Sequence, residues 1–286
     1  MAKLQPYKGD SYLWEYLPSL AGAITFTLLF TLVTIAHGWR MFKSKLWFCI
    51  PFFIGGLQAE ILGYFFRALA WNATNSLAIY IMQALFLLLP PVLFAATIYM
   101  VYSRVVRAVD GQHCSPISAR WTTRIFVFGD FITFNIQSNG GGLLASPKLA
   151  NIGNIIVIVG LISQILLFLA FVVCCIVFHK RFRAHVKRTS IPVEVPWKSC
   201  LGMLYFTSVL ILVRNIFRVV EFVMDKEGYL QQKEWPTFVF DSVLMLLVMI
   251  AFYIWYPDNL RTHSRDSTIE LAPKRIPSSE NAGVSN

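Results

Sequence analysis

The sequence predicts an all-α protein, a polytopic membrane bundle of seven transmembrane helices. Its 286 residues are 56% hydrophobic and only 14% charged, whereas soluble domains carry about 25% charged residues. The apolar residues come in runs of roughly twenty, the length that an α-helix needs to cross a hydrocarbon core about 30 Å thick. Because these runs are continuous rather than alternating, they exclude a transmembrane β-barrel.

Seven candidate spans follow one another with short polar connections: 16–39, 47–70, 77–103, 121–144, 152–178, 199–223 and 236–256. They form one domain, residues 16–257, preceded by a short segment, 1–15. No basic stretch with a short apolar run and a cleavage site opens the chain, so we expect the first span to stay as an anchor. The last residues, 258–286, are rich in Ser, Thr, Pro and charge and predict a disordered tail.

The basic residues predict the orientation. They follow the first, third and fifth spans and continue in the tail: Arg40, Lys43, Lys45, Arg104, Arg107, Arg120, Lys180, Arg181, Arg183, Lys187, Arg188, Lys198, Arg261, Arg265, Lys274 and Arg275. The opposite side holds only Lys3, Lys8, Lys148, Lys226 and Lys233. Cytoplasmic segments of membrane proteins are enriched in Lys and Arg, so we expect the N-terminus outside and the C-terminus in the cytosol.

A sequon for N-glycosylation, Asn72-Ala73-Thr74, follows the second span. The orientation puts this connection on the outer face, where glycosylation takes place. Asn72 is therefore a candidate glycosylation site, and its position agrees with the predicted topology.

Ionisable and amide side chains within the spans are the main candidates for a functional site, because such groups are costly in hydrocarbon. They are Glu60 and Arg67 in the second span, Asp130 and Gln137 in the fourth, Arg214, Arg218 and Glu221 in the sixth, and Asp241 in the seventh. Spacings of four and seven residues place the members of each span on one helix face. With a rise of about 1.5 Å per residue, most of them fall in the outer half of the membrane, while Asp130 falls near the middle.

Two interpretations of these residues are compatible with each other. Acids and arginines can form interhelical pairs that hold the bundle together. They can also line an outward-facing polar vestibule that takes the headgroup of an amphiphile while its tail stays in lipid. Asp130, with no partner at its depth, is the candidate for a protonatable or cation-binding carboxylate.

Two local motifs carry structural predictions. Pro90-Pro91 removes backbone donors inside the third span and predicts a fixed bend there. The run Gly140-Gly141-Gly142 lacks the Lys-Ser/Thr of a phosphate-binding loop and predicts instead the end of the fourth helix.

Several segments together resemble the fungal lipid-translocating exporter family, the proteins related to the aminocholesterol-resistance protein. They are residues 16–19, 60–67, 91–100, 126–130, 137–142, 160–164 and 210–221, with Glu234 and Phe240-Asp241 further on. The resemblance implies a multi-pass plasma-membrane protein that moves or releases amphiphilic lipids such as sphingoid long-chain bases. It also implies tolerance to toxic amphiphiles, with membrane lipids and amphiphilic small molecules as partners.

Other functions fit the sequence less well. A seven-helix sensor or receptor of lipid or membrane stress is the alternative, although the third span ends in Tyr102-Ser103-Arg104 rather than the Asp/Glu-Arg-Tyr of common G-protein-coupled receptors. A zinc-dependent lipid hydrolase needs several converging ligands, and only His37 among the histidines lies in a span. We therefore predict no catalytic residues, no metal and no cofactor, and the basic residues show no aromatic-interleaved patch for nucleic acid.

Overall fold

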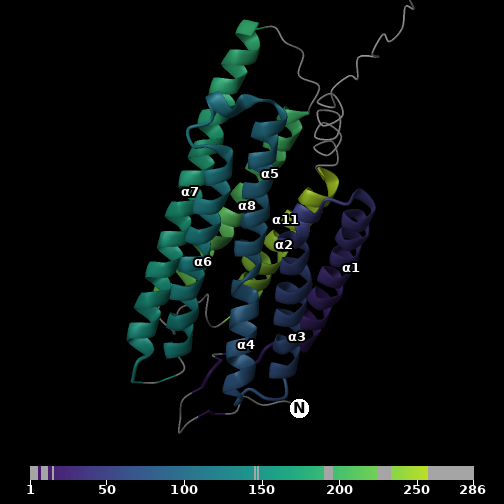
Figure 1. Cartoon of the computed structure of the whole chain (residues 1–286). Helices are drawn as coiled ribbons and strands as arrows, with labels where there is room; N and C mark the ends of the chain where they lie inside the picture. The colour runs from purple at the N-terminus through teal and green to yellow at the C-terminus, as the bar shows by residue number, and fades with distance from the viewer. Residues whose placement is uncertain are drawn as a thin grey trace, which may run out of the picture.

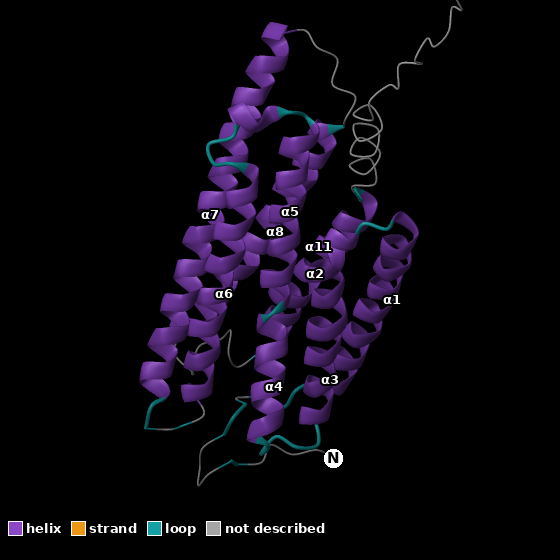
Figure 2. Ribbon diagram, in the orientation of Figure 1, coloured by secondary structure: helices purple, strands orange, loops and turns teal. Residues whose placement is uncertain are grey.

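The computed structural model describes residues 6–7, 12–14, 16–144, 146, 148–189, 196–224 and 233–256, and these residues form helices and connections without a β-strand (Figures 1 and 2). The prediction of an all-α protein is confirmed for this part of the chain. The predicted disordered tail, 258–286, and most of the segment 1–15 lie outside the described residues.

The helices follow the predicted spans, except that the fifth one continues eleven residues past the predicted end at residue 178 and reaches Thr189. The first stretch is α1 (Leu20–Ser44). The second consists of η1 (Trp47–Cys49), α2 (Ile50–Ile54), η2 (Gly55–Glu60) and α3 (Ile61–Ala70). The third consists of α4 (Leu77–Leu88) and α5 (Pro90–Ala108). After the short η3 (Gly111–Cys114) come α6 (Ala119–Leu144), α7 (Ala150–Thr189) and α8 (Trp197–Val223). The last described stretch joins α10 (Trp235–Thr237), η4 (Phe238–Val243) and α11 (Leu244–Ile254).

Five of these stretches are long and apolar enough to cross a membrane: Leu20–Ser44, Leu77–Ala108, Ala150–Arg188, Trp197–Val223 and Trp235–Ile254. The predicted spans 47–70 and 121–144 are helical but do not belong to this set. The first is divided into short pieces by the π-helical turn η2. The second, α6, carries Asp130, Gln137 and several Asn and Thr residues, which lower its hydropathy.

Successive stretches run in alternating directions between two ends of an elongated bundle (Figure 1). The turn after α1, the α5–α6 connection and the end of α7 lie at one end, and the α3–α4 and α6–α7 connections lie at the other. The basic residues that follow the first, third and fifth spans therefore share one end of the molecule. We call this the basic end and the other one the sequon end, because Asn72 lies there in the α3–α4 connection, where its side chain is exposed.

Helices α6 and α7 pack closely along small residues. A Cβ atom added to Gly140 would lie 2.9 Å from both the carbonyl oxygen of Gly153 and the backbone nitrogen of Val157. One added to Gly160 would lie 2.7 Å from Cγ of Gln137. Small residues let helix backbones approach in this way inside membranes. The prediction that Gly140-Gly141-Gly142 ends the fourth helix was wrong in detail, since α6 continues through the three glycines to Leu144.

Candidate functional site

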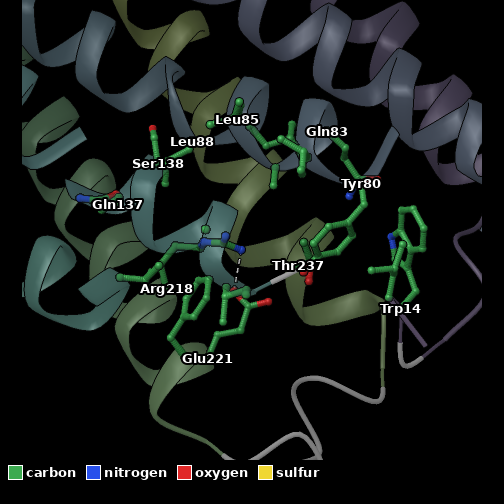
Figure 3. Close-up of a pocket in the computed structure, with 18 of the residues that line it drawn as sticks. Trp14, Tyr80, Gln83, Leu85, Leu88, Gln137, Ser138, Arg218, Glu221 and Thr237 are labelled. Carbon is green, nitrogen blue, oxygen red and sulfur yellow. Dashed lines mark hydrogen bonds and ion pairs between the residues drawn. The ribbon is translucent and has the colours of Figure 1, made fainter. Parts of the chain in front are cut away.

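A cavity of about 230 Å³ lies at the sequon end of the bundle. It is lined by the C-terminal parts of α3, α6 and α8, by α4, by Val157 of α7 and by the start of the last stretch. Leu13, Trp14 and Tyr16 complete its wall, and Figure 3 shows Trp14 beside it. Five of the predicted site residues lie in its wall: Arg67, Gln137, Arg218, Glu221 and Asp241. We call it the polar cavity. Glu60, Asp130 and Arg214 do not line it.

Arg67 joins three segments that are far apart in the sequence. Its Nη2 lies 2.8 Å from Oε1 of Glu234 and 2.9 Å from the hydroxyl oxygen of Tyr16. The same Glu234 carboxylate accepts the backbone N–H of Ser19, the N-cap residue of α1, at 3.0 Å. The buried Arg67 guanidinium and the Glu234 carboxylate thus connect the N-terminal ends of α1 and of the last stretch to the C-terminal end of α3.

Arg214 on α8 is buried and holds two partners. Its Nε forms an ion pair with Oδ1 of Asp241, and its Nη2 donates to the backbone carbonyl oxygen of Leu87 at 2.7 Å. That carbonyl needs a side-chain donor because its helical partner would be the nitrogen of Pro91, which carries no hydrogen. Pro91 therefore leaves a backbone acceptor within the third stretch, and an arginine from another helix satisfies it.

Arg218 and Glu221 pair with each other on α8, with Nη1 2.6 Å from Oε2. Their side chains are 17% and 16% exposed, so they are less buried than Arg214 and Asp241. Figure 3 shows this pair at the lower edge of the polar cavity, with Trp14 and Tyr80 on one side and Gln137 and Ser138 on the other.

The acidic residues Glu60 and Asp241 belong to two π-helical turns, η2 in the second stretch and η4 in the last. Glu60 ends the first and Asp241 lies in the second. The hydroxyl groups of Tyr64 and Ser242 hydrogen-bond each other and connect these two stretches. Glu60 is 2% exposed and lies within electrostatic range of Asp241 and Arg214. π-helical turns often occur at functional sites, and nothing in the span pattern predicted them.

Asp130 lies apart from this cluster. It is 1% exposed, and its Oδ2 accepts the hydroxyl of Tyr99, on α5, at 2.8 Å. The Tyr99 ring packs against Phe126, Phe168 and Phe171. The structure thus gives Asp130 a partner that the sequence did not suggest. Gln137, two turns further along α6, donates its amide to Gln164 on α7 at 2.8 Å.

Sequence reasoning missed three polar groups in the cavity wall that have no hydrogen-bond partner among the described residues. Trp14 and Gln83 are 6% and 8% exposed, and the indole Nε1 and amide Oε1 find no hydrogen-bond partner among the described residues. The hydroxyl of Ser138 is likewise buried and unpaired within that part of the chain. Gln83 and Ser138 are uncharged, so a search for charged residues within the spans does not identify them. Trp14 was missed because it precedes the first predicted span.

The helices and the cavity define a multi-pass helical membrane protein with a chamber between its helices. The wall of this chamber is mainly apolar and includes the charged residues Arg67, Arg218, Glu221 and Asp241. Among the described residues, no three His, Cys, Asp or Glu side chains gather in a metal-binding arrangement.

The family model for RTA1 like protein matches residues 52–264, and the chain belongs to this family. It is 33% identical over 280 residues to Protoporphyrin uptake protein 1 of Saccharomyces cerevisiae, and the aligned region covers 85% of this chain and 91% of that protein. It is 27% identical to Lipid-translocating exporter-like protein RTA1 of Leptosphaeria maculans, and the aligned region covers 73% of this chain and 41% of that protein. It is 21% identical to Sphingoid long-chain base transporter RSB1 of Saccharomyces cerevisiae, and the aligned region covers 91% of this chain and 76% of that protein. The resemblance found in the sequence is thus confirmed, and no solved structure matches the chain.

Proposed function

We propose that this protein is a transporter that moves or releases amphiphilic lipids such as sphingoid long-chain bases and thereby confers tolerance to toxic amphiphiles. The polar cavity is the observation that carries this proposal. Its volume, about 230 Å³, is below the roughly 300–1,000 Å³ of sites that enclose a drug-sized ligand. It therefore suits a compact headgroup, with the hydrocarbon chain left outside in lipid.

The charges around the cavity favour a headgroup with a single positive charge. Three arginines each pair with one acid: Arg67 with Glu234, Arg214 with Asp241 and Arg218 with Glu221. Glu60 is a further buried carboxyl group beside Asp241. When Glu60 is ionised, the surplus of one acid attracts a cation. Unpaired groups such as the Gln83 amide oxygen can accept hydrogen bonds from an ammonium or hydroxyl group.

The proposed topology has seven crossings, an outside N-terminus and a cytosolic C-terminus, with the plasma membrane as the location. The shared basic end supports it, because positive residues concentrate on the cytosolic side. Exposed tryptophans near both ends support it too, since tryptophan gathers at membrane interfaces. They are Trp39, Trp47, Trp121 and Trp255 towards the basic end and Trp235 towards the sequon end.

The chain has no nucleotide-binding loop in its sequence, so we propose movement that is downhill or coupled to an ion. The sequence suggests Glu60 and Asp130 as candidate proton carriers, and we propose Glu60 for this role. Glu60 fits this role better, since it lies within electrostatic range of Asp241, which lines the cavity.

Transport can be tested with purified protein in lipid vesicles and a fluorescent sphingoid base. We expect movement across the bilayer above that of protein-free vesicles. Gln83→Leu removes an unpaired buried amide and should reduce transport without loss of fold stability, because no existing hydrogen bond is broken.

Asn139→Leu is the matched control. This asparagine is exposed on α6, donates only to the carbonyl of Asn135 in its own helix, and does not line the cavity. It should transport like the unmodified protein. Vesicles that move no base above the protein-free level would refute the transporter. Tight binding without movement would favour the alternative, a sensor of lipid or membrane stress.

A further inference from the structure

Three successive glycines lie near the end of α6, and packing explains only the first, Gly140, which does not line the polar cavity. A Cβ atom on Gly140 would collide with the backbone of α7. A Cβ atom on Gly141 or Gly142 would meet nothing within 4 Å. All three are helical and none has the positive φ that favours glycine. Because glycine weakens a helix relative to alanine, Gly141 and Gly142 need another explanation.

The position of these two glycines supplies that explanation. Both line the polar cavity, and Gly142 is also exposed at the protein surface. Ala84 on α4 has the same two properties. The cavity therefore reaches the surface between α4 and α6, at two residues with little or no side chain to obstruct it.

The surface of α6 changes character away from this opening. Asn135 and Asn139 are exposed nearer to it, and Phe128, Phe131 and Ile132 are exposed about 15–21 Å along the helix from Gly142. With a rise of about 1.5 Å per residue, Ala84 lies about 10 Å along α4 from its first residue and Gly142 about 3 Å from the end of α6. Both positions therefore lie near the sequon end of the bundle.

Inside the opening, the cavity offers hydrogen-bonding groups that lack a partner. Trp14 and Gln83 are more than nine-tenths buried, and the unpaired Nε1 and Oε1 atoms belong to residues of the cavity wall. A buried polar group without a partner is costly. The polar headgroup of a bound molecule would satisfy both.

We propose that the opening between α4 and α6, bordered by Ala84, Gly141 and Gly142, is a lateral portal. Through it, the headgroup of a single-chain amphiphile enters the polar cavity from the adjacent leaflet, while its hydrocarbon chain stays in lipid. This inference rests on the transporter proposed above and adds the route by which the substrate arrives.

The portal is tested by filling it. Gly141→Leu and Gly142→Leu add a side chain where the protein leaves empty space, and leucine is the better helix former. We expect the unfolding temperature to stay equal or rise. Transport of a long-chain sphingoid base in vesicles should fall roughly tenfold, since overfilling a cavity by several carbon atoms excludes a ligand. Gly142→Ala, which adds one methyl group, should have a smaller effect in the same direction.

Gly202→Leu is the matched control. A Cβ atom at Gly202 also meets nothing within 4 Å, and the residue is exposed on α8, about 24 Å along the helix from Arg218 of the cavity. Its transport rate should equal that of the unmodified protein. Unchanged transport in both Gly141→Leu and Gly142→Leu would overturn the portal and leave the transporter standing, whereas an unmodified protein that moves no base would refute the transporter itself.

A second measurement locates the route directly. A long-chain base with a diazirine on its chain close to the headgroup should label α4 or α6 in the unmodified protein and in Gly202→Leu. Labelling of these helices should fall in Gly142→Leu. Labelling that is confined to other helices, or that persists in Gly142→Leu, would overturn the portal even if transport is reduced.

Discussion

Two arginines on one face of α8 show how burial sets the cost of removing a charge. Arg214 is 2% exposed and satisfies both Asp241 and the Leu87 carbonyl. Arg218 pairs with Glu221 at a partly exposed edge of the cavity. Removing the first leaves a buried carboxylate and a carbonyl without partners, while removing the second leaves a carboxylate that water can reach.

Arg214→Met is therefore expected to lower the free energy of unfolding by about 3–5 kcal/mol, and Arg218→Met by about 1 kcal/mol. Unfolding of the two variants in the same detergent would measure the difference. Equal losses would show that the depth of burial does not control the cost of these two ion pairs.

The environment of Asp130 leads to a further prediction about a single side chain. Its Oδ2 accepts a hydrogen bond from Tyr99, and the residue does not line the polar cavity. Asp130→Asn keeps an acceptor for this bond, so we expect an unchanged fold and unchanged transport of cationic amphiphiles. Asp130→Leu removes the acceptor and should destabilise the protein by about 1–3 kcal/mol. Impaired transport in a stable Asp130→Asn variant would restore the proton- or cation-binding role suggested by the sequence.

Among the helical elements, the break between α4 and α5 has the clearest consequence. α4 ends at Leu88 and α5 begins at Pro90, as the proline pair predicted. The break does more than bend the chain, because the missing N–H of Pro91 leaves the Leu87 carbonyl available to Arg214. The proline, the carbonyl and the arginine thus couple the third stretch to α8.

A double-mutant cycle tests this coupling. In Pro91→Ala, the new backbone N–H can pair with the Leu87 carbonyl. Arg214→Leu should then cost about 1 kcal/mol less in the Pro91→Ala background than in the unmodified protein. Both arms leave Asp241 without its partner, so that loss cancels. Strictly additive unfolding free energies would show that the contact between Arg214 and Leu87 contributes nothing to stability.

For the molecule as a whole, the two ends provide a test of the proposed topology. Asn72 is exposed at the sequon end and Gln112 at the basic end. Asn72→Cys should react with a membrane-impermeant maleimide in intact cells, whereas Gln112→Cys should react only after permeabilisation. Four of the five native cysteines, Cys49, Cys114, Cys175 and Cys200, are buried, which keeps background labelling low. The reverse pattern would invert the orientation. In the unmodified protein, which keeps the sequon, a shift of mobility on deglycosylation would show that Asn72 is glycosylated.

The amino-acid sequence was sufficient for the helical class, the approximate bounds of each stretch and the family. These follow from local physics, since a run of about twenty apolar residues in lipid must satisfy its own backbone hydrogen bonds. Ionisable and amide side chains within the apolar runs could also be identified from the sequence, because burying them in hydrocarbon is costly. Five of them, Arg67, Gln137, Arg218, Glu221 and Asp241, line one cavity.

Partner choice depended on how the helices pack in three dimensions. Glu234 meets Arg67 across 167 residues and Arg214 meets Leu87 across 127 residues, and helical periodicity holds no information at such separations. The same packing separated Asp130 from the cluster and brought Trp14, Gln83 and Ser138 to the cavity wall. It also distinguished Gly140, which a neighbouring backbone contacts, from Gly141 and Gly142, which face open space. A helix pattern specifies which face a residue lies on, but only the neighbouring helix determines what that face meets.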